Sequence, residues 1–116
     1  MSERNLLGAF EEMVLLAVAR GEGDAYGMSV RRDVQVRSGR DVTIGAVYST
    51  LDRLQAKGFV GSESRVGDGA RDGQARRCFE LAAEGATALL EARDRHDRVW
   101  SEMDTERLAN VAGSGE

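Results

Sequence analysis

Apolar residues recur at helical spacing along most of the chain, and two shorter apolar runs flank a glycine-rich connection. The first helical pattern covers residues 5–20, where Leu6, Phe10 and Val14 share one face and neighbouring leucines widen it. A helix that is apolar around most of its circumference is buried on more than one side. We therefore expect this segment, through Phe10 and Val14, to pack both on its own domain and on a partner chain.

Two more helices and a hairpin follow. Residues 25–39 end at a glycine, and residues 43–57 carry apolar side chains three or four positions apart. Thr43 can cap the second of these helices at its start, and a glycine can end it. Beyond it, residues 59–66 and 74–81 flank a connection rich in Gly and Asp, which is the pattern of a short β-hairpin.

The last helical pattern runs from residue 82 to about residue 108. Its less polar positions alternate in steps of four and three, as in the seam of a coiled coil. They are Gly85, Leu89, Ala92, His96, Val99 and Met103. Such a helix extends beyond a small domain and needs a partner, so we expect Leu89, Ala92, Val99 and Met103 to form a homodimer interface.

These elements predict a mainly α fold with a small β-hairpin. Three short helices followed by a hairpin with a glycine-rich tip give the order of a winged helix-turn-helix, here over residues 5–81. Residues 82–108 are expected to form a C-terminal dimerisation helix, and residues 109–116 a disordered tail.

The third helical segment opens with unusually small side chains. Thr43, Gly45, Ala46 and Ser49 occupy its first turns. In a winged helix-turn-helix the third helix enters the major groove by its N-terminal end, where large side chains would hold the backbone away from the bases. We therefore predict that these four residues face bases. The hydroxyl of Tyr48 either reaches a phosphate or the ring simply packs at the edge of the core.

The net charge of −4 hides a split along the chain. Residues 26–77 contain ten Lys or Arg against six Asp or Glu, whereas the remainder is strongly acidic. A basic centre with acidic ends is typical of a DNA-binding region flanked by other surfaces, although ordinary solvated charge would also account for it. The residues predicted to hold DNA phosphates are Arg31, Arg32, Arg53, Arg71, Arg76 and Arg77.

Composition excludes several other classes. No apolar run approaches the roughly 20 residues that span a bilayer, and the N-terminus lacks the order of a signal peptide, so a cytoplasmic location is expected. One cysteine, Cys78, excludes an internal disulfide and a cysteine-cluster zinc site, and we expect no metal or other cofactor.

His96 lies beside Asp94 and Asp97, but neighbours in a helix do not face one another, so we expect no catalysis. Cys78 is either a small apolar strand residue or a reversible redox switch.

The order and spacing of these segments resemble the PadR-like family of transcriptional regulators, in its short form with a single C-terminal helix. The marks are LGAFEEMVLL in the first helix, Tyr26 and Gly27 at the start of the second, GAVYSTLDRLQAKGFV through the third, and GQARRCFELAAEG from the wing into the last helix. The resemblance covers roughly residues 6–103. It implies a dimeric repressor that reads a DNA operator with its helix-turn-helix and wing and is often released by a small ligand.

The wing departs from the family pattern. Gln74 and Ala75 replace the usual Arg-Pro pair, and Asp68 and Asp72 would repel phosphate. The alternative function is therefore a winged-helix protein-interaction module that no longer binds DNA and recruits a partner through its long helix.

Trp100 suggests where a ligand would bind. It follows Val99 in the last helix and lies one turn after His96. In a dimer the two indoles could approach the axis, and their flat faces together with His96 would suit a planar aromatic ligand. Some short PadR-like regulators have a site of this kind, so the resemblance favours it. The alternative is that Trp100 packs on the first helix of the other chain.

Overall fold

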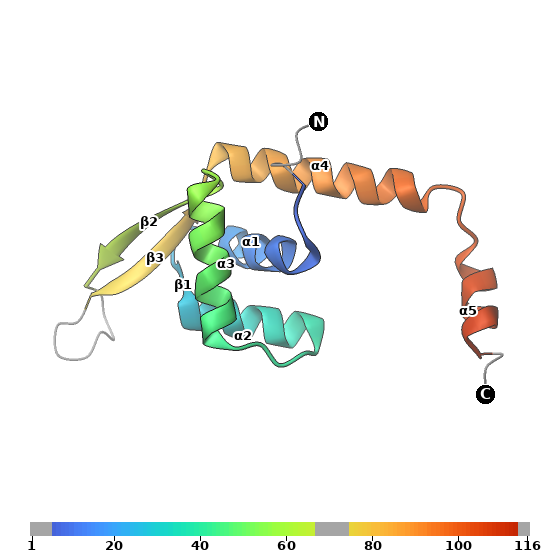
Figure 1. Cartoon of the computed structure of the whole chain (residues 1–116), viewed down its shortest axis with the longest axis horizontal. Helices are drawn as coiled ribbons and strands as arrows, with labels where there is room; N and C mark the ends of the chain where they lie inside the picture. Colours follow the sequence, from blue (N-terminus) through green and yellow to red (C-terminus); the bar gives the residue numbers. More distant parts are fainter. Residues whose placement is uncertain (1–5, 67–74, 114–116) are drawn as a thin grey trace.

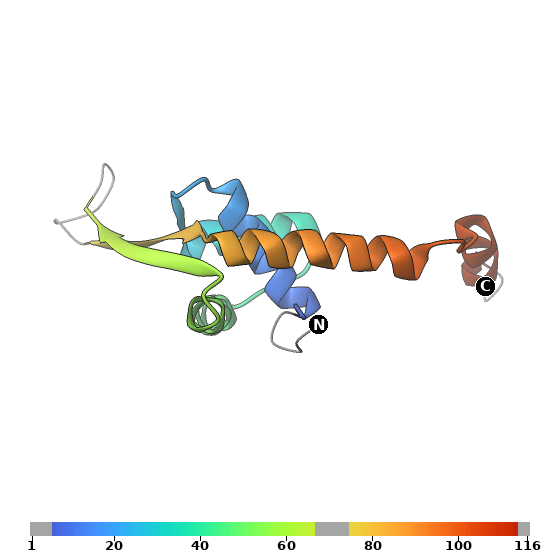
Figure 2. The same ribbon diagram turned by 90° about the horizontal axis from the view of Figure 1, so that it is seen from above.

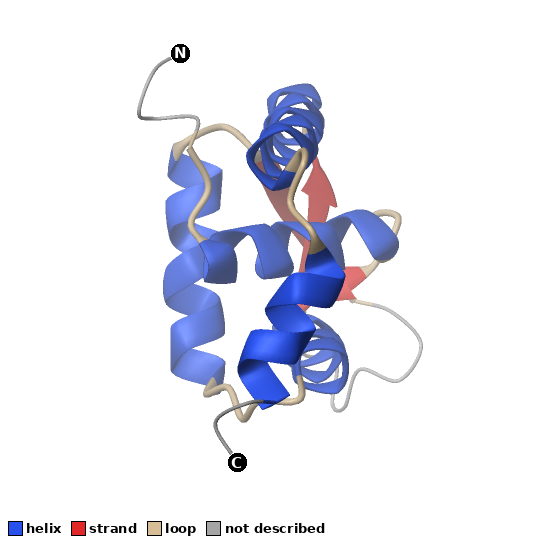
Figure 3. Ribbon diagram, turned by 90° about the vertical axis from the view of Figure 1, so that its right-hand side faces the viewer, coloured by secondary structure: helices blue, strands red, loops and turns tan. Residues whose placement is uncertain are grey.

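The computed structural model describes residues 6–66 and 75–113. In chain order the elements are α1 (Ala9–Arg20), β1 (Ala25–Tyr26), α2 (Gly27–Ser38), α3 (Ile44–Ala56), β2 (Val60–Arg65), β3 (Arg76–Leu81), α4 (Ala83–Trp100) and α5 (Thr105–Gly113). Helices α1 to α3 pack together beside the sheet, and α4 crosses over α1 and extends outward to α5 (Figure 1). The strands lie on the side of the domain opposite α5 (Figure 3).

The sheet has three antiparallel strands in the order β1-β3-β2. Strands β2 and β3 pair along all six residues of each and form the wing. Ala25 and Tyr26 add two pairs at the other edge of β3, opposite Phe79 and Cys78. The expected winged-helix fold with its hairpin is confirmed. Strand β1 was not predicted, because two residues are too few to show an alternating pattern.

The core lies where the three helices meet β3. Its fully buried side chains recur three or four positions apart in each helix, and Phe79 is the largest of them. They include Val14, Leu15 and Val18 of α1, Val30 and Val34 of α2, and Val47, Leu51 and Leu54 of α3. Because apolar burial is the main force that drives folding, this periodicity fixes which face of each helix points inward.

Two residues assigned to a dimer interface belong to this single-chain packing instead. Val14 of α1 and Ala92 of α4 are both fully buried within the chain. They leave no surface for a partner subunit, so the expectation does not hold for them. The seam positions of α4 are mostly apolar, as predicted, but those in the first half of the helix are buried or half-buried against the rest of the same chain.

The start of α4 rests directly on the backbone of Phe59. The Phe59 carbonyl oxygen accepts a hydrogen bond from the Ala82 N–H at 2.9 Å. A Cβ atom on Gly85 would overlap with that same carbonyl oxygen and would lie 2.9 Å from Cδ1 of Leu81. Only a residue without a side chain lets α4 approach this closely, so Gly85 fixes where the long helix begins.

Helix α4 ends at Trp100 rather than near residue 108. Glu102 has a φ of 64°, in the left-handed region that interrupts a helix. The Asp104 carboxylate then accepts the Arg107 N–H at 3.1 Å and caps α5. Residues 109–113, expected in a disordered tail, therefore lie in a helix. None of the residues of α5 is buried, and this helix lies beyond the far end of α4 (Figure 2).

No helix in the described segments combines the length and apolar character needed to cross a membrane.

We predict that Gly85→Ala destabilises the protein by about 1–3 kcal/mol, because the added methyl group meets a backbone carbonyl that cannot rotate away. Urea denaturation followed by circular dichroism measures the change in the free energy of unfolding. Gly113→Ala is the matched control, since a Cβ there would meet nothing within 4 Å. Equal midpoints for the two variants would contradict the close contact at Gly85.

Candidate nucleic-acid interface

The first turn of α3 presents small side chains to solvent. Thr43 caps the helix, because its Oγ1 accepts the Ala46 N–H at 3.1 Å. Thr43, Gly45, Ala46 and Ser49 are all exposed. A Cβ on Gly45 would meet nothing within 4 Å, although alanine would favour the helix by about 1 kcal/mol. Packing inside the chain therefore gives no reason for glycine at this position, whereas close approach by an external molecule does.

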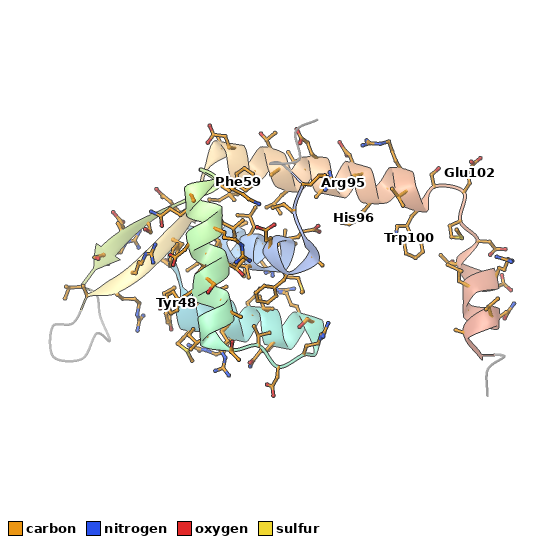
Figure 4. All side chains as sticks on the ribbon, in the orientation of Figure 1. Tyr48, Phe59, Arg95, His96, Trp100 and Glu102 are labelled. Atoms are coloured by element: carbon orange, nitrogen blue, oxygen red, sulfur yellow. The ribbon has the colours of Figure 1, made fainter. Side chains whose placement is uncertain are left out.

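Tyr48 joins α3 to the start of α2. A Cβ on Gly27 would overlap with the Tyr48 ring and hydroxyl, so the ring lies directly against the α2 backbone. The residue remains 38% exposed, and it projects from the lower half of α3 (Figure 4). The packing role expected for the ring is present. Contact of its hydroxyl with a phosphate stays a prediction.

Two of the predicted phosphate contacts are paired with carboxylates of the chain. Arg53 lies 3.7 Å from a carboxylate oxygen of Glu11. Arg77 lies 3.1 Å from Asp52 and also donates to Gln55 at 2.6 Å. These pairs satisfy part of each guanidinium, so both arginines are weaker candidates for DNA contact than the sequence indicated.

Three other predicted contacts have no ion pair with any carboxylate in the described segments. Arg31 donates from Nε to the Val42 carbonyl at 2.7 Å, which holds the loop before α3. Arg32 donates to the Tyr26 hydroxyl at 3.0 Å. Arg76 stacks on the Tyr26 ring, with its Cζ 3.9 Å from the ring centre. Their remaining donors are available to an external anion.

The tip of the wing lies outside the described residues. The predictions for Arg71, Asp68, Asp72 and Gln74 therefore stay as they were made from the sequence.

Arg40 is a basic residue that was not among the predicted DNA contacts. It is exposed in the turn just before Thr43. Its position next to the predicted recognition helix could have marked it as a candidate phosphate contact.

Acidic residues anchor the helices behind this surface. Arg20 of α1 donates to Asp33 of α2, and this bond together with a second one from Arg37 lowers the pKa of Asp33. Burial raises the pKa of Glu11, but hydrogen bonds from the Gly8 N–H and from Lys57 outweigh it, so the pKa of Glu11 is lowered overall. Both carboxylates are therefore charged at neutral pH and hold α1 against α2 and α3.

The two predicted ligand contacts lie on α4. His96 Nε2 lies 3.0 Å from a carboxylate oxygen of Glu12 and borders an open, mostly apolar groove of about 500 Å³ between α1 and α4. Leu16, Leu81, Ala86, Leu89, Leu90, Arg93 and Asp97 complete its lining. Trp100 lies one turn beyond the groove on the same helix (Figure 4) and is 56% exposed. The structure therefore connects His96 to a groove but leaves Trp100 outside it.

The remaining interface candidates differ in how much surface they leave for a partner, since Phe10 and Leu89 also pack against the core of their own chain. Phe10 and Leu89 are half-buried, and Met103 is exposed. Val99 is 74% exposed, because α4 has passed the end of α1 at this point (Figure 1). Cys78 is buried in β3, as expected of a small apolar strand residue.

A wing beside a capped helix with an exposed, small-residue start defines a winged helix-turn-helix protein. Residues 15–91 match the model of the PadR-like family of transcriptional regulators, and the chain belongs to this family, as the sequence motifs predicted. The chain is 39% identical over 97 residues to transcriptional regulator Rv3488 of Mycobacterium tuberculosis, a match that covers 81% of this chain and 82% of that protein. The family and this relative are transcriptional regulators.

Solved structures share the fold. A complex structure of RosR from H. salinarum, hsRosR-S1, matches with a TM-score of 0.66 and 23% identity and covers 99% of this chain and 100% of that one. A PadR family transcription regulator from Clostridium difficile matches with a TM-score of 0.63 and 22% identity, covering 87% and 99%.

Proposed function

We propose that this regulator is a homodimeric repressor that binds a pseudo-palindromic operator with α3 and the wing and is released by a small planar aromatic ligand. We also propose a cytoplasmic location, where a repressor would bind its operator. The observation that carries DNA binding is the exposed row of small residues at the start of α3, above all Gly45, whose missing side chain serves no packing purpose inside the chain.

In this proposal, different residues contact the bases and the phosphates. Thr43, Gly45, Ala46 and Ser49 face base edges in the major groove, whereas arginines on α2 and the wing hold the backbone on either side. In a dimer the two α3 helices would enter successive major grooves about one helical turn apart. The arginines without carboxylate partners in the described segments carry most of this electrostatic attraction.

We predict that Gly45→Ala separates stability from DNA binding. The substitution should stabilise the fold by up to about 1 kcal/mol, because alanine favours the helix. It should weaken operator binding about tenfold or more, because the methyl group holds α3 away from the bases. The operator is obtained by sequencing the genomic fragments that the protein retains. Thermal denaturation and fluorescence anisotropy on that fragment then measure the two effects.

Gly113→Ala serves as the control here also, since it adds the same methyl group on α5 and should leave DNA affinity unchanged. Unaltered affinity of Gly45→Ala would exclude close approach of α3 to the bases. If the wild-type protein retains no genomic fragment, the alternative of a protein-interaction module takes the place of the repressor.

Apolar residues at the end of α4 support the homodimer. Val99 and Trp100 are exposed at the end of a helix that overhangs its own domain, and Met103 is exposed just beyond that end. Leu90 is exposed further back along the same helix. Adjoining apolar side chains of this kind are more typical of an interface than of a surface in contact with water. A second α4 related by a two-fold axis would cover the same residues on both subunits.

We predict that multi-angle light scattering at micromolar concentration gives twice the chain mass of 12.6 kDa. The double substitution Val99→Glu with Met103→Glu should give the monomer mass, because it buries charge in the interface. Val36→Glu is the control, since Val36 on α2 is 83% exposed and lies far from α4 along the chain. A monomeric wild-type protein would exclude the dimer.

The groove beside His96 supports a ligand site near the dimer interface. It is of the size of small-molecule sites, and the exposed indole of Trp100 follows it along α4. A planar aromatic molecule bound between the α4 helices would weaken operator binding only if it bound one arrangement of the dimer more tightly than another.

We predict that some phenolic acids or planar multidrug dyes quench Trp100 emission and lower operator affinity over the same concentration range. Trp100→Ala should remove the DNA response while the light-scattering mass stays that of a dimer. If no compound quenches the emission and Trp100→Ala instead breaks the dimer, Trp100 is a packing residue on the other chain's first helix.

A further inference from the structure

Tyr26 holds two arginines that come from different elements. The Arg76 guanidinium of β3 lies over its ring at 3.9 Å, and Arg32 of α2 donates to its hydroxyl at 3.0 Å. Strand register explains the first contact. Tyr26 pairs with Cys78, so Arg76 is its diagonal neighbour on the same face, within reach of a long side chain.

These contacts orient the arginines without occupying them. A guanidinium that stacks on a ring uses its flat face and keeps its five N–H donors, which lie in its own plane. Arg32 uses one N–H on the tyrosine hydroxyl and keeps the others. Each arginine therefore offers oriented donors that match the geometry of a phosphate.

Neither arginine forms an ion pair within residues 6–66 and 75–113. By contrast, Arg53 and Arg77 are paired with Glu11 and Asp52. Since both Arg32 and Arg76 are exposed as well, an anion at this place would meet less internal competition than one at the paired arginines.

The position is continuous with the start of α3. Tyr26 precedes Gly27, and the Tyr48 ring of α3 lies directly against Gly27. Strand β1 lies between the wing and the lower part of α3, where α2 begins (Figure 1). The backbone of a DNA strand that flanks the major groove occupied by α3 would pass this place.

We propose that Tyr26, Arg32 and Arg76 form a phosphodiester-binding site in which Tyr26 is a positioning residue. Arg32 and Arg76 bind backbone phosphates, and Tyr26 fixes both guanidinium groups before DNA arrives. Preorganisation of this kind strengthens binding because fewer side-chain conformations are lost in the complex. The site rests on the proposed DNA binding and adds a determinant of its affinity that does not touch a base.

The first test uses Tyr26→Phe, which removes the hydroxyl and keeps the ring. It should weaken binding of the selected operator about two- to tenfold, the effect of one lost hydrogen bond on an arginine. The same substitution in an Arg32→Ala background should have almost no effect, because Tyr26 acts through Arg32. Thermal denaturation verifies that both variants are folded.

The second test concerns the stacked arginine. Arg76→Ala should lower the slope of log affinity against log salt by about 1.8 for a dimer, since each copy loses one phosphate contact. Tyr26→Leu should weaken binding about two- to fivefold more than Tyr26→Phe does, through lost stacking, and this additional loss should disappear once Arg76 is alanine. Arg98→Ala, an exposed arginine on α4, is the control and should leave the slope unchanged.

Coupling of Tyr26 to both arginines would support the site. If the wild-type protein binds the operator but the tyrosine variants weaken it equally with and without the arginines, Tyr26 acts through the fold and the site is excluded. If the arginine variants leave affinity and slope unchanged, no phosphate binds there. A wild-type protein that binds no duplex at all would exclude operator binding, and this site with it.

Discussion

The backbone carbonyl of Phe59 supports the start of α4, and the direction of the whole helix depends on this contact. The carbonyl accepts the Ala82 N–H and lies where Gly85 leaves room for it. Phe59 also follows directly on the turn that ends α3, where its own N–H is bonded to the Leu54 carbonyl. Helices α3 and α4 therefore share one short junction. In the proposed dimer, a second chain bound along α4 would hold the two α3 helices at a spacing that this junction sets.

The distribution of charge matters more here than the net value of −4. Several acidic residues are used inside the domain, where Glu11 and Asp33 hold the helices together and Asp52 pairs with Arg77. Pairing of this kind removes positive charge from part of the surface as well. What remains for the proposed DNA contact is a small set of arginines that are oriented by neutral groups, such as the Tyr26 ring and the Val42 carbonyl. An acidic chain can thus present a basic face.

The sequence was sufficient for the elements whose signals are local. The apolar spacing identified the buried stripe of α3, Thr43 was recognised as its cap, and the glycine-rich connection indicated the wing. Features set by tertiary contact were missed. The seam pattern of α4 could not distinguish a partner in the same chain from one in another, so Ala92 was assigned to a dimer although its own chain already buries it. The role of Tyr26 was hidden too, because it depends on the pairing of β1 with β3.

Helix α4 combines a fixed end with a free one, and this arrangement suits a regulator. Its first turns are held at Gly85 and Ala92, whereas Val99 and Trp100 extend past the domain. A helix rises about 1.5 Å per residue, so a tilt of about 5° beyond Ala92 would displace Trp100 by about 1 Å. In the proposed dimer, the same tilt in both subunits would change the separation of the two α3 helices while the buried part of α4, up to Ala92, stays in place. A ligand that binds near Trp100 therefore needs to favour only one tilt over another to alter the fit of the dimer to its operator.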